Sequence, residues 1–177
     1  GLGGGSADAA CCLMLLNNLF NLNLSGKDLK KYALKLGSDC AFFIENKPML
    51  AKGRGEILEN IQLSLYGKYI AIVYPPIHIS TAQAYAGIAP KQPDYPLTEL
   101  SSLPLNQWKQ YVKNDFEENI FKAHPQIAEI KEQLYKKGAI YASMSGSGSS
   151  VFGIFEEIPD ISKAFRNCYT YEGILED

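Results

Sequence analysis

The sequence has few of the residues that build disulfide scaffolds and metal sites. Its 177 residues include four cysteines, two histidines and one tryptophan. The cysteines form no Cys-x-x-Cys pair, and small domains held together by disulfides are much richer in cysteine. These scarcities disfavour a disulfide framework and a zinc site. They favour reduced thiols in a cytoplasmic protein.

The chain also lacks a surplus of basic charge and a long hydrophobic run. Seventeen basic residues face nineteen acidic ones, so we expect no nucleic-acid partner. The longest apolar runs, 9–16 and 69–77, are too short to cross a bilayer, and no signal-peptide pattern opens the chain. We therefore expect no membrane partner. What remains is an ordinary globular composition, with 46% apolar and 20% charged residues.

Hydrophobic patterns predict a mixture of helices and strands. The predicted helices are 7–20, 27–36, 80–85, 105–112, 115–137 with an interruption near Pro125, and 161–167. The predicted strands are 40–44, 49–52, 56–58, 68–74, 139–144, 150–155 and 169–174. The first helix is apolar nearly all round, which is typical of a buried helix.

The order of elements in the second half predicts antiparallel strands with helices on one face, and hence an α+β fold. Pro90, Pro93 and Pro96 place a loop between the halves. The composition changes near this stretch, at about residues 77–96. We therefore assign residues 1–77 to one domain and 78–177 to another.

The first ten residues, Gly1 to Ala10, combine a glycine-rich loop with the start of a helix. Glycines allow positive φ angles and close approach of a ligand to the backbone. Their N–H groups and the helix N-terminus favour an anion, and the Ser6 hydroxyl could bind phosphate or Mg²⁺. The alternative is a flexible linker, although a linker is seldom followed at once by an apolar helix. It is not a Walker A loop, because no Gly-Lys-Ser/Thr follows.

Two further segments could complete a phosphate site. Asp39 lies between a helix end and an apolar run, where a carboxylate could face the glycine loop; the alternative is an Asp that bonds its own turn. Residues 145–150 are a glycine- and serine-rich connection between two predicted strands. They could lie near a bound phosphate or be only a flexible hairpin loop.

Together, the three segments resemble the motifs of the GHMP kinase superfamily, which includes galactokinases and the homoserine and mevalonate kinases. Gly1 to Ala10 resembles the superfamily's phosphate loop, and Ser143 to Gly148 resembles its third motif. Four other segments resemble, more specifically, the family of 4-diphosphocytidyl-2-C-methyl-D-erythritol kinases. They are Leu36–Phe43 (LGSDCAFF), Gly53–Glu56 (GRGE), Pro75–Tyr85 (PPIHISTAQAY) and Asn114–Glu117 (NDFE).

The resemblance implies a GHMP-kinase fold, with a partial N-terminal half like domain 2 of ribosomal protein S5 and a ferredoxin-like C-terminal half. It implies ATP-dependent phosphorylation of the 2-hydroxyl of diphosphocytidyl methylerythritol, in isoprenoid biosynthesis. Asp39 would be the catalytic base, and Thr81 would contact the substrate. Ser6 would also lie near Mg²⁺. The residues expected to bind the phosphates of ATP are Gly1, Leu2, Gly3, Gly4, Gly5, Ser6, Ala7, Gly146, Ser147 and Gly148.

The start of the chain carries a further expectation. The sequence opens on the glycine loop without an initiator Met, and by the resemblance family members have a preceding segment with a first motif and a catalytic lysine. We therefore expect residues 1–177 alone to be inactive and to self-associate. Two alternatives stay open: another GHMP small-molecule kinase, of homoserine or mevalonate type, and a non-catalytic binding module with this fold.

Overall fold

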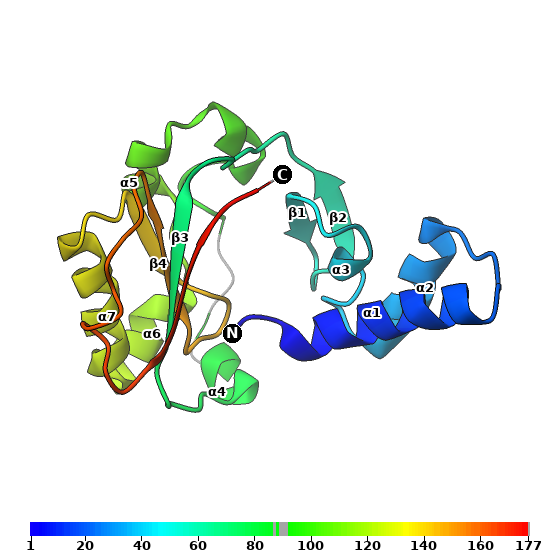
Figure 1. The fold of residues 1–177 in the computed structure, drawn as a ribbon, viewed down its shortest axis with the longest axis horizontal. Coiled ribbons are helices and arrows are strands. Elements are labelled where there is room, and N and C mark those ends of the chain that lie inside the picture. Colours follow the sequence, from blue (N-terminus) through cyan, green and yellow to red (C-terminus); the bar gives the residue numbers. More distant parts are fainter. Residues whose placement is uncertain (87, 89–91, 177) are drawn as a thin grey trace. The chain divides into compact units, whose positions relative to one another are not determined.

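The computed structural model describes residues 1–86, 88 and 92–176, shown in Figure 1. The chain forms two compact units. The helical unit is Gly3–Leu63, and the sheet unit is Gly1–Leu2 together with Ser64–Asp177. Pro90, expected in a loop, lies outside the described residues.

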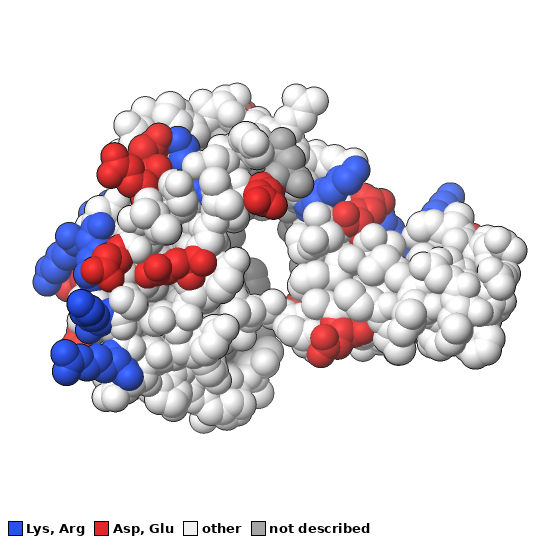
Figure 2. All heavy atoms as spheres, viewed as in Figure 1, with Lys and Arg blue, Asp and Glu red and all other residues white. Residues whose placement is uncertain are grey.

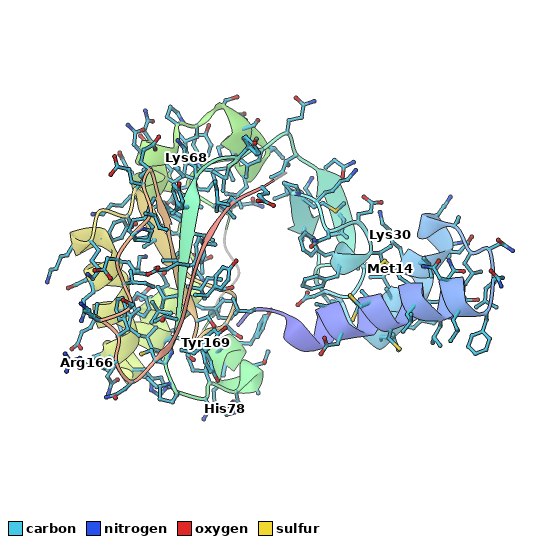
Figure 3. All side chains as sticks on the ribbon, viewed as in Figure 1. Met14, Lys30, Lys68, His78, Arg166 and Tyr169 are labelled. Atoms are coloured by element: carbon cyan, nitrogen blue, oxygen red, sulfur yellow. The ribbon has the colours of Figure 1, made fainter. Side chains whose placement is uncertain are left out.

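The helical unit consists of helices α1 (Gly4–Leu19), α2 (Gly26–Leu36) and α3 (Phe42–Glu45), followed by strands β1 (Met49–Lys52) and β2 (Ile57–Asn60). The two strands pair antiparallel. Local sequence explains both ends of α2. Ser25 caps its start, accepting a hydrogen bond from the Asp28 N–H at 3.2 Å, and Gly37 ends it. Figure 3 labels Met14 of α1 and Lys30 of α2, and Lys30 pairs with Glu45 of α3.

The predicted strand at 40–44 is wrong. Residues 38–41 form a turn, and the short helix α3 follows. A short apolar run does not by itself distinguish a strand from a buried turn and helix. Here Cys40 and Ala41 pack with Ala33 of α2, and this burial fixes the turn.

Helix α1 forms as expected but is not buried. Ala10 is its only buried residue, whereas Leu15 and Leu19 are 62% and 65% exposed. The helix is apolar nearly all round, and α2 and α3 contact it within this unit. Apolar side chains therefore remain on the surface of the helical unit.

The sheet unit contains four strands in the order β4-β5-β3-β6, and each neighbouring pair is antiparallel. Strand β3 is Tyr69–Tyr74, β4 is Tyr141–Met144, β5 is Val151–Phe155 and β6 is Tyr169–Ile174. The helices are α4 (Thr81–Ala86), α5 (Trp108–Tyr111), α6 (Phe116–Ala123) and α7 (Pro125–Lys136), with 3₁₀ turns η1 (Leu97–Ser102) and η2 (Leu105–Gln107). The α+β class and the interruption at Pro125 are confirmed.

The core of the sheet unit lies between the sheet and helices α6 and α7. Ile127 and Leu134 of α7 are fully buried against Val73 of β3 and Val151 of β5. The predicted helix at 161–167 is wrong, because residues 162–164 form only a turn. Ile161 and Phe165 are both buried in the same core, and their spacing of four residues imitates a helix.

The compact units divide the chain at residues 63 and 64 rather than at residue 77. The reason is that β3 pairs with both β5 and β6, so it belongs to the four-stranded sheet. The assignment of residues 1–77 and 78–177 to two family domains stays a prediction.

Candidate active site

The glycine loop leads directly into α1. Gly3 is the residue before the helix and adopts φ 68°, in the left-handed region that glycine tolerates best. No side chain caps this end of the helix. The first backbone N–H groups of a helix have no partner within it, so those of Gly4, Gly5 and Ser6 form a site that favours an anion. A side chain at Gly3 would also lie 3.0 Å from the Phe43 ring, which leaves little room for a larger residue.

Asp39 lies on the surface of the turn between α2 and α3. Its neighbour Cys40 is buried at 3% exposure, so the turn is anchored on one side and the carboxylate is presented to solvent. Gly55, in the turn between β1 and β2, lies close beside it. A Cβ at Gly55 would be 3.0 Å from Asp39 Oδ1. The GRGE turn therefore accommodates the Asp39 carboxylate because it has no side chain there.

Gly1 lies against the second glycine-rich loop, Ser145–Gly148, within the sheet unit. Ser145 Oγ donates a hydrogen bond to the Gly1 carbonyl oxygen at 2.6 Å. A Cβ at Gly1 would lie 2.8 Å from the Gly148 carbonyl oxygen. The structure thus brings Gly1 to Gly146 and Gly148, from which it is more than 140 residues away in the sequence.

The Ser145–Gly148 loop is not a free hairpin. Gly146 and Gly148 have φ angles of 54° and 89°, and a Cβ at Gly148 would lie 2.9 Å from Ile79 Cδ1. Asn114 donates hydrogen bonds to the carbonyl oxygens of Gly146, in the loop, and of Met144, just before it. The sequence indicated the NDFE segment as a family feature but assigned no role to Asn114 or Glu117.

Thr81 begins α4 and is exposed. It follows Ser80, whose hydroxyl accepts a hydrogen bond from the Gln83 N–H at 3.2 Å. Through Ile79, the same segment reaches the Gly148 backbone. Thr81 therefore begins a helix next to the second glycine-rich loop.

The predicted site residues are divided between the two units. Gly1, Leu2, Thr81, Gly146, Ser147 and Gly148 belong to the sheet unit, whereas Gly3, Gly4, Gly5, Ser6, Ala7 and Asp39 belong to the helical unit. Leu2 is 52% exposed, and the peptide bond after it joins the two sets.

Within the described residues, no group of three or more His, Cys, Asp or Glu side chains is placed to hold a metal ion. The lack of such a group among the described residues is compatible with Mg²⁺ in a kinase. This ion is typically held by substrate phosphates, water and one or two protein oxygens. The Ser6 hydroxyl, in the first turn of α1, is the oxygen expected from the sequence to lie near this ion. In the part of the chain that is described, no helix is both long and apolar enough for a membrane span.

Models of known protein families match two segments of the chain. The model of the GHMP kinases N-terminal domain matches residues 1–47, and that of the GHMP kinases C-terminal region matches residues 100–170. The chain belongs to the GHMP kinase superfamily. The sequence-based prediction of this superfamily is confirmed.

Individual relatives agree with one another. A protein of Bacteroides thetaiotaomicron is 54% identical over 156 residues, which cover 88% of this chain and 57% of the relative. A protein of Parabacteroides distasonis is 45% identical over 177 residues, covering 99% of this chain and 65% of the relative. Both are named 4-diphosphocytidyl-2-C-methyl-D-erythritol kinase. This chain therefore spans about 60% of the length of such relatives.

Solved structures show the same fold. A crystal structure of 4-(cytidine 5'-diphospho)-2C-methyl-D-erythritol kinase has a TM-score of 0.82 at 28% identity, over 99% of this chain and 66% of that one. A homoserine kinase from Cytophaga hutchinsonii has a TM-score of 0.56 at 16% identity, over 91% of this chain and 61% of that one. The GHMP-kinase fold is confirmed, and the second likeness concerns the fold alone.

Proposed function

We propose that the complete protein phosphorylates the 2-hydroxyl of 4-diphosphocytidyl-2-C-methyl-D-erythritol with ATP, in cytoplasmic isoprenoid biosynthesis. The observation that carries the proposal is the identity of 54% to a relative that is named as this kinase. The geometry supports it, because an uncapped helix N-terminus follows the glycine loop and an exposed carboxylate lies in the same unit.

The chemistry needs few groups. The hydroxyl oxygen attacks the γ-phosphorus of ATP, a new O–P bond forms, and the bond from that phosphorus to the β,γ-bridging oxygen breaks to release ADP. Asp39 accepts the hydroxyl proton as the bond forms. Phosphoryl transfer depends mainly on positioning and charge stabilisation. The N–H groups at the start of α1 supply part of that stabilisation. In the sheet unit, the proposed phosphate-binding residues are Ser147 and the neighbouring glycines.

Mg²⁺, when bound, neutralises charge on the β- and γ-phosphate oxygens. Ser6 is the residue that would hold it, through its hydroxyl. Thr81 would contact the acceptor near its reacting end. ATP and this acceptor are the proposed small-molecule partners of the complete protein.

An acceptor panel on the full-length protein tests the proposal. ATP is supplied with diphosphocytidyl methylerythritol, homoserine or mevalonate, and kcat/KM is measured for each. We expect the diphosphocytidyl compound to be preferred by several orders of magnitude, because a site that hydrogen-bonds a polar substrate group rejects analogues without it. Preference for homoserine or mevalonate would contradict the proposal and favour the alternative kinase.

The second alternative is a non-catalytic module that binds a nucleotide without turnover. The exposed carboxylate of Asp39 argues against it, because a binding module has no need of a base. Calorimetric titration with ATP beside the turnover assay separates the two. ATP binding with no product from any acceptor would support the module.

We also propose that residues 1–177, taken alone, do not transfer phosphate and self-associate. The relatives are longer than this chain, and apolar side chains are exposed on α1 and α2. Leu16, Leu19, Tyr32 and Leu36 of these helices, and Phe20 directly after α1, are each at least 40% exposed. On the face drawn in Figure 2, the surface over α1 carries few charged atoms. Exposed apolar patches of this kind favour association. Light scattering tests whether residues 1–177 self-associate. A monomer that transfers phosphate would contradict both the expected inactivity and the expected self-association.

A further inference from the structure

Asn114, just before α6, uses both polar atoms of its amide group to connect the Ser145–Gly148 loop with the start of α6. Its Nδ2 donates hydrogen bonds to the carbonyl oxygens of Met144 and Gly146, each at 2.8 Å. Its Oδ1 accepts from the Phe116 N–H at 3.0 Å. One side chain therefore ties the end of β4 and the first glycine of the loop to the start of α6.

Glu117, in the first turn of α6, fixes the preceding residues. Its Oε1 accepts hydrogen bonds from the Met144 N–H at 2.8 Å and from Ser143 Oγ at 3.1 Å. Its Oε2 lies 2.5 Å from Lys131 Nζ of α7, and the Glu117 side chain is 12% exposed. Hydrogen bonds to a charged, largely buried carboxylate are stronger than neutral ones. The end of β4, which leads into the loop, is thus linked to α6 and, through Lys131, to α7.

The loop needs such support because of its composition. Two of its four residues are glycines with positive φ angles, and glycine has the largest conformational freedom to lose. Among the described residues, the backbone N–H groups of Gly146 and Ser147 have no acceptor. N–H groups that bind an anion must converge on it in a fixed arrangement.

We propose that Asn114 and Glu117 are positioning residues that hold Ser145–Gly148 in the conformation that binds the phosphate groups of the nucleotide. The proposal rests on the proposed kinase function and adds to it the two side chains that preorganise the second phosphate-binding loop. Neither side chain needs to touch the nucleotide. Asn114 acts through the carbonyl groups of Met144 and Gly146, and Glu117 acts through Ser143 and Met144 at the end of β4.

The sharpest variant is Asn114→Asp. It keeps an oxygen that accepts from Phe116 N–H, but it removes both hydrogen bonds to the loop and places a carboxylate oxygen against two carbonyl oxygens. The control is Asn106→Asp, the same chemical change at an exposed position of η2. Glu117→Gln is the second variant. It keeps the shape and an acceptor, and removes the charge that faces Lys131.

The structural readout is amide hydrogen exchange in the 177-residue chain. The N–H groups of Ser145 and Gly148 donate to carbonyl oxygens within the loop region, at 2.8 and 3.0 Å. We expect their exchange to become about 10-fold faster or more in Asn114→Asp, with a smaller increase in Glu117→Gln, because the loop opens more often. Exchange in Asn106→Asp should match the unchanged protein. Equal exchange in all four proteins would overturn the proposal.

The functional readout is the affinity and KM for ATP in the full-length protein. Asn114→Asp should weaken ATP binding about 10-fold or more, since two hydrogen bonds that preorganise the loop are lost. The KM for the acceptor should stay unchanged, which general destabilisation of the fold would not explain. Unchanged ATP affinity in both variants would overturn the proposal. Absence of ATP binding in the unchanged full-length protein would instead contradict the proposed function.

Discussion

The sheet unit and the helical unit differ in how their apolar residues are used. In the sheet unit, buried side chains from β3, β4, β5, α6 and α7 form one continuous core, with Ile127 and Leu134 fully buried. In the helical unit, the core cluster contains three buried residues, Ala33, Cys40 and Ala41, while several leucines of α1 and α2 are exposed. The sheet unit has the larger source of hydrophobic stabilisation.

The groups proposed to act on the substrate and on ATP lie mainly in the helical unit, which has the smaller core. The carboxylate expected to act as base, Asp39, and the helix N-terminus of α1 lie in the helical unit. The sheet unit supplies the Ser145–Gly148 loop, which Asn114 restrains directly at Gly146 and Glu117 of α6 restrains through Met144. The difference teaches that the groups expected to react can lie on a thinly packed unit, while a densely packed unit restrains a loop of its own.

The largest effect should come from Asp39→Asn in the full-length protein. The amide keeps the shape of the side chain but cannot accept the hydroxyl proton, so turnover should fall by about 10² to 10⁴. Calorimetry should show little change in ATP affinity. Near-normal kcat would assign Asp39 to the turn alone and leave the helical unit without its proposed base.

A matched pair of truncations tests the difference in packing. Ile127 is fully buried and Leu19 is 65% exposed. Ile127→Ala should lower the free energy of unfolding by about 2–5 kcal/mol, because it leaves a cavity. Leu19→Ala should change it by less than about 0.5 kcal/mol.

Denaturant unfolding followed by the fluorescence of Trp108, the single tryptophan, gives the measurement for the sheet unit. Hydrogen exchange of α1 amides gives the corresponding measurement for Leu19→Ala. Equal losses at the two positions would contradict the contrast between the units.

Tyr141 provides a pH test of burial in the sheet unit. Burial raises its pKa from 10.0 to about 12, since the charged phenolate is disfavoured away from water. The folded state therefore holds the phenol proton more tightly than the unfolded state. The contribution of the protonated Tyr141 to the free energy of unfolding is fully present below pH 10. It is lost as the pH rises towards 12.

The unchanged protein should lose on the order of 2 kcal/mol of unfolding free energy by pH 12 through Tyr141, and Tyr141→Phe should not show this loss. The measurement is the free energy of unfolding between pH 9 and pH 12, with Tyr66→Phe at an exposed position as control. The same pH dependence in both variants would show that Tyr141 is not shielded from water in the folded chain.

The smallest effect should come from a glycine in the helical unit. Gly55 has φ 104°, and a Cβ there would meet Asp39 Oδ1 at 3.0 Å, whereas a Cβ at Gly53 would meet the Glu56 side chain. Both alanine variants strain the same turn, but only Gly55→Ala displaces the carboxylate. Turnover of the full-length protein should fall about 10-fold for Gly55→Ala and less for Gly53→Ala, since small displacements of a reacting group are costly. Equal turnover in the two variants would show that Gly55 does not control the position of the Asp39 carboxylate.

Local signals were sufficient for many elements of the fold. Ser25 and Gly37 mark both ends of α2, the helix predicted at 27–36, and Pro125 separates α6 from α7 at the predicted interruption. The run at 40–44 was misread, because the burial of Cys40 and Ala41 depends on contacts with Ala33 that the run itself does not contain. The exposure of α1 was missed for the same reason, since an apolar pattern does not say which neighbours are present.

The site divides in the same way. The glycine loop and Asp39 could be proposed from residue type and resemblance, but the hydrogen bonds of Asn114 and Glu117 could not. Asn114 binds the backbone of residues about 30 positions away, and no local pattern indicates a contact across that distance. The NDFE segment was the available signal, and its role became visible only when β4 and α6 were placed together.

The most direct test of the proposed function is mass spectrometry of the products that the full-length protein forms from ATP and 4-diphosphocytidyl-2-C-methyl-D-erythritol. The account predicts ADP and an acceptor that has gained one phosphoryl group, with ³¹P NMR placing the new phosphomonoester on the 2-hydroxyl. Product formation should nearly vanish in Asp39→Asn. An unmodified acceptor in the presence of bound ATP, or a phosphoryl group on another hydroxyl, would contradict it.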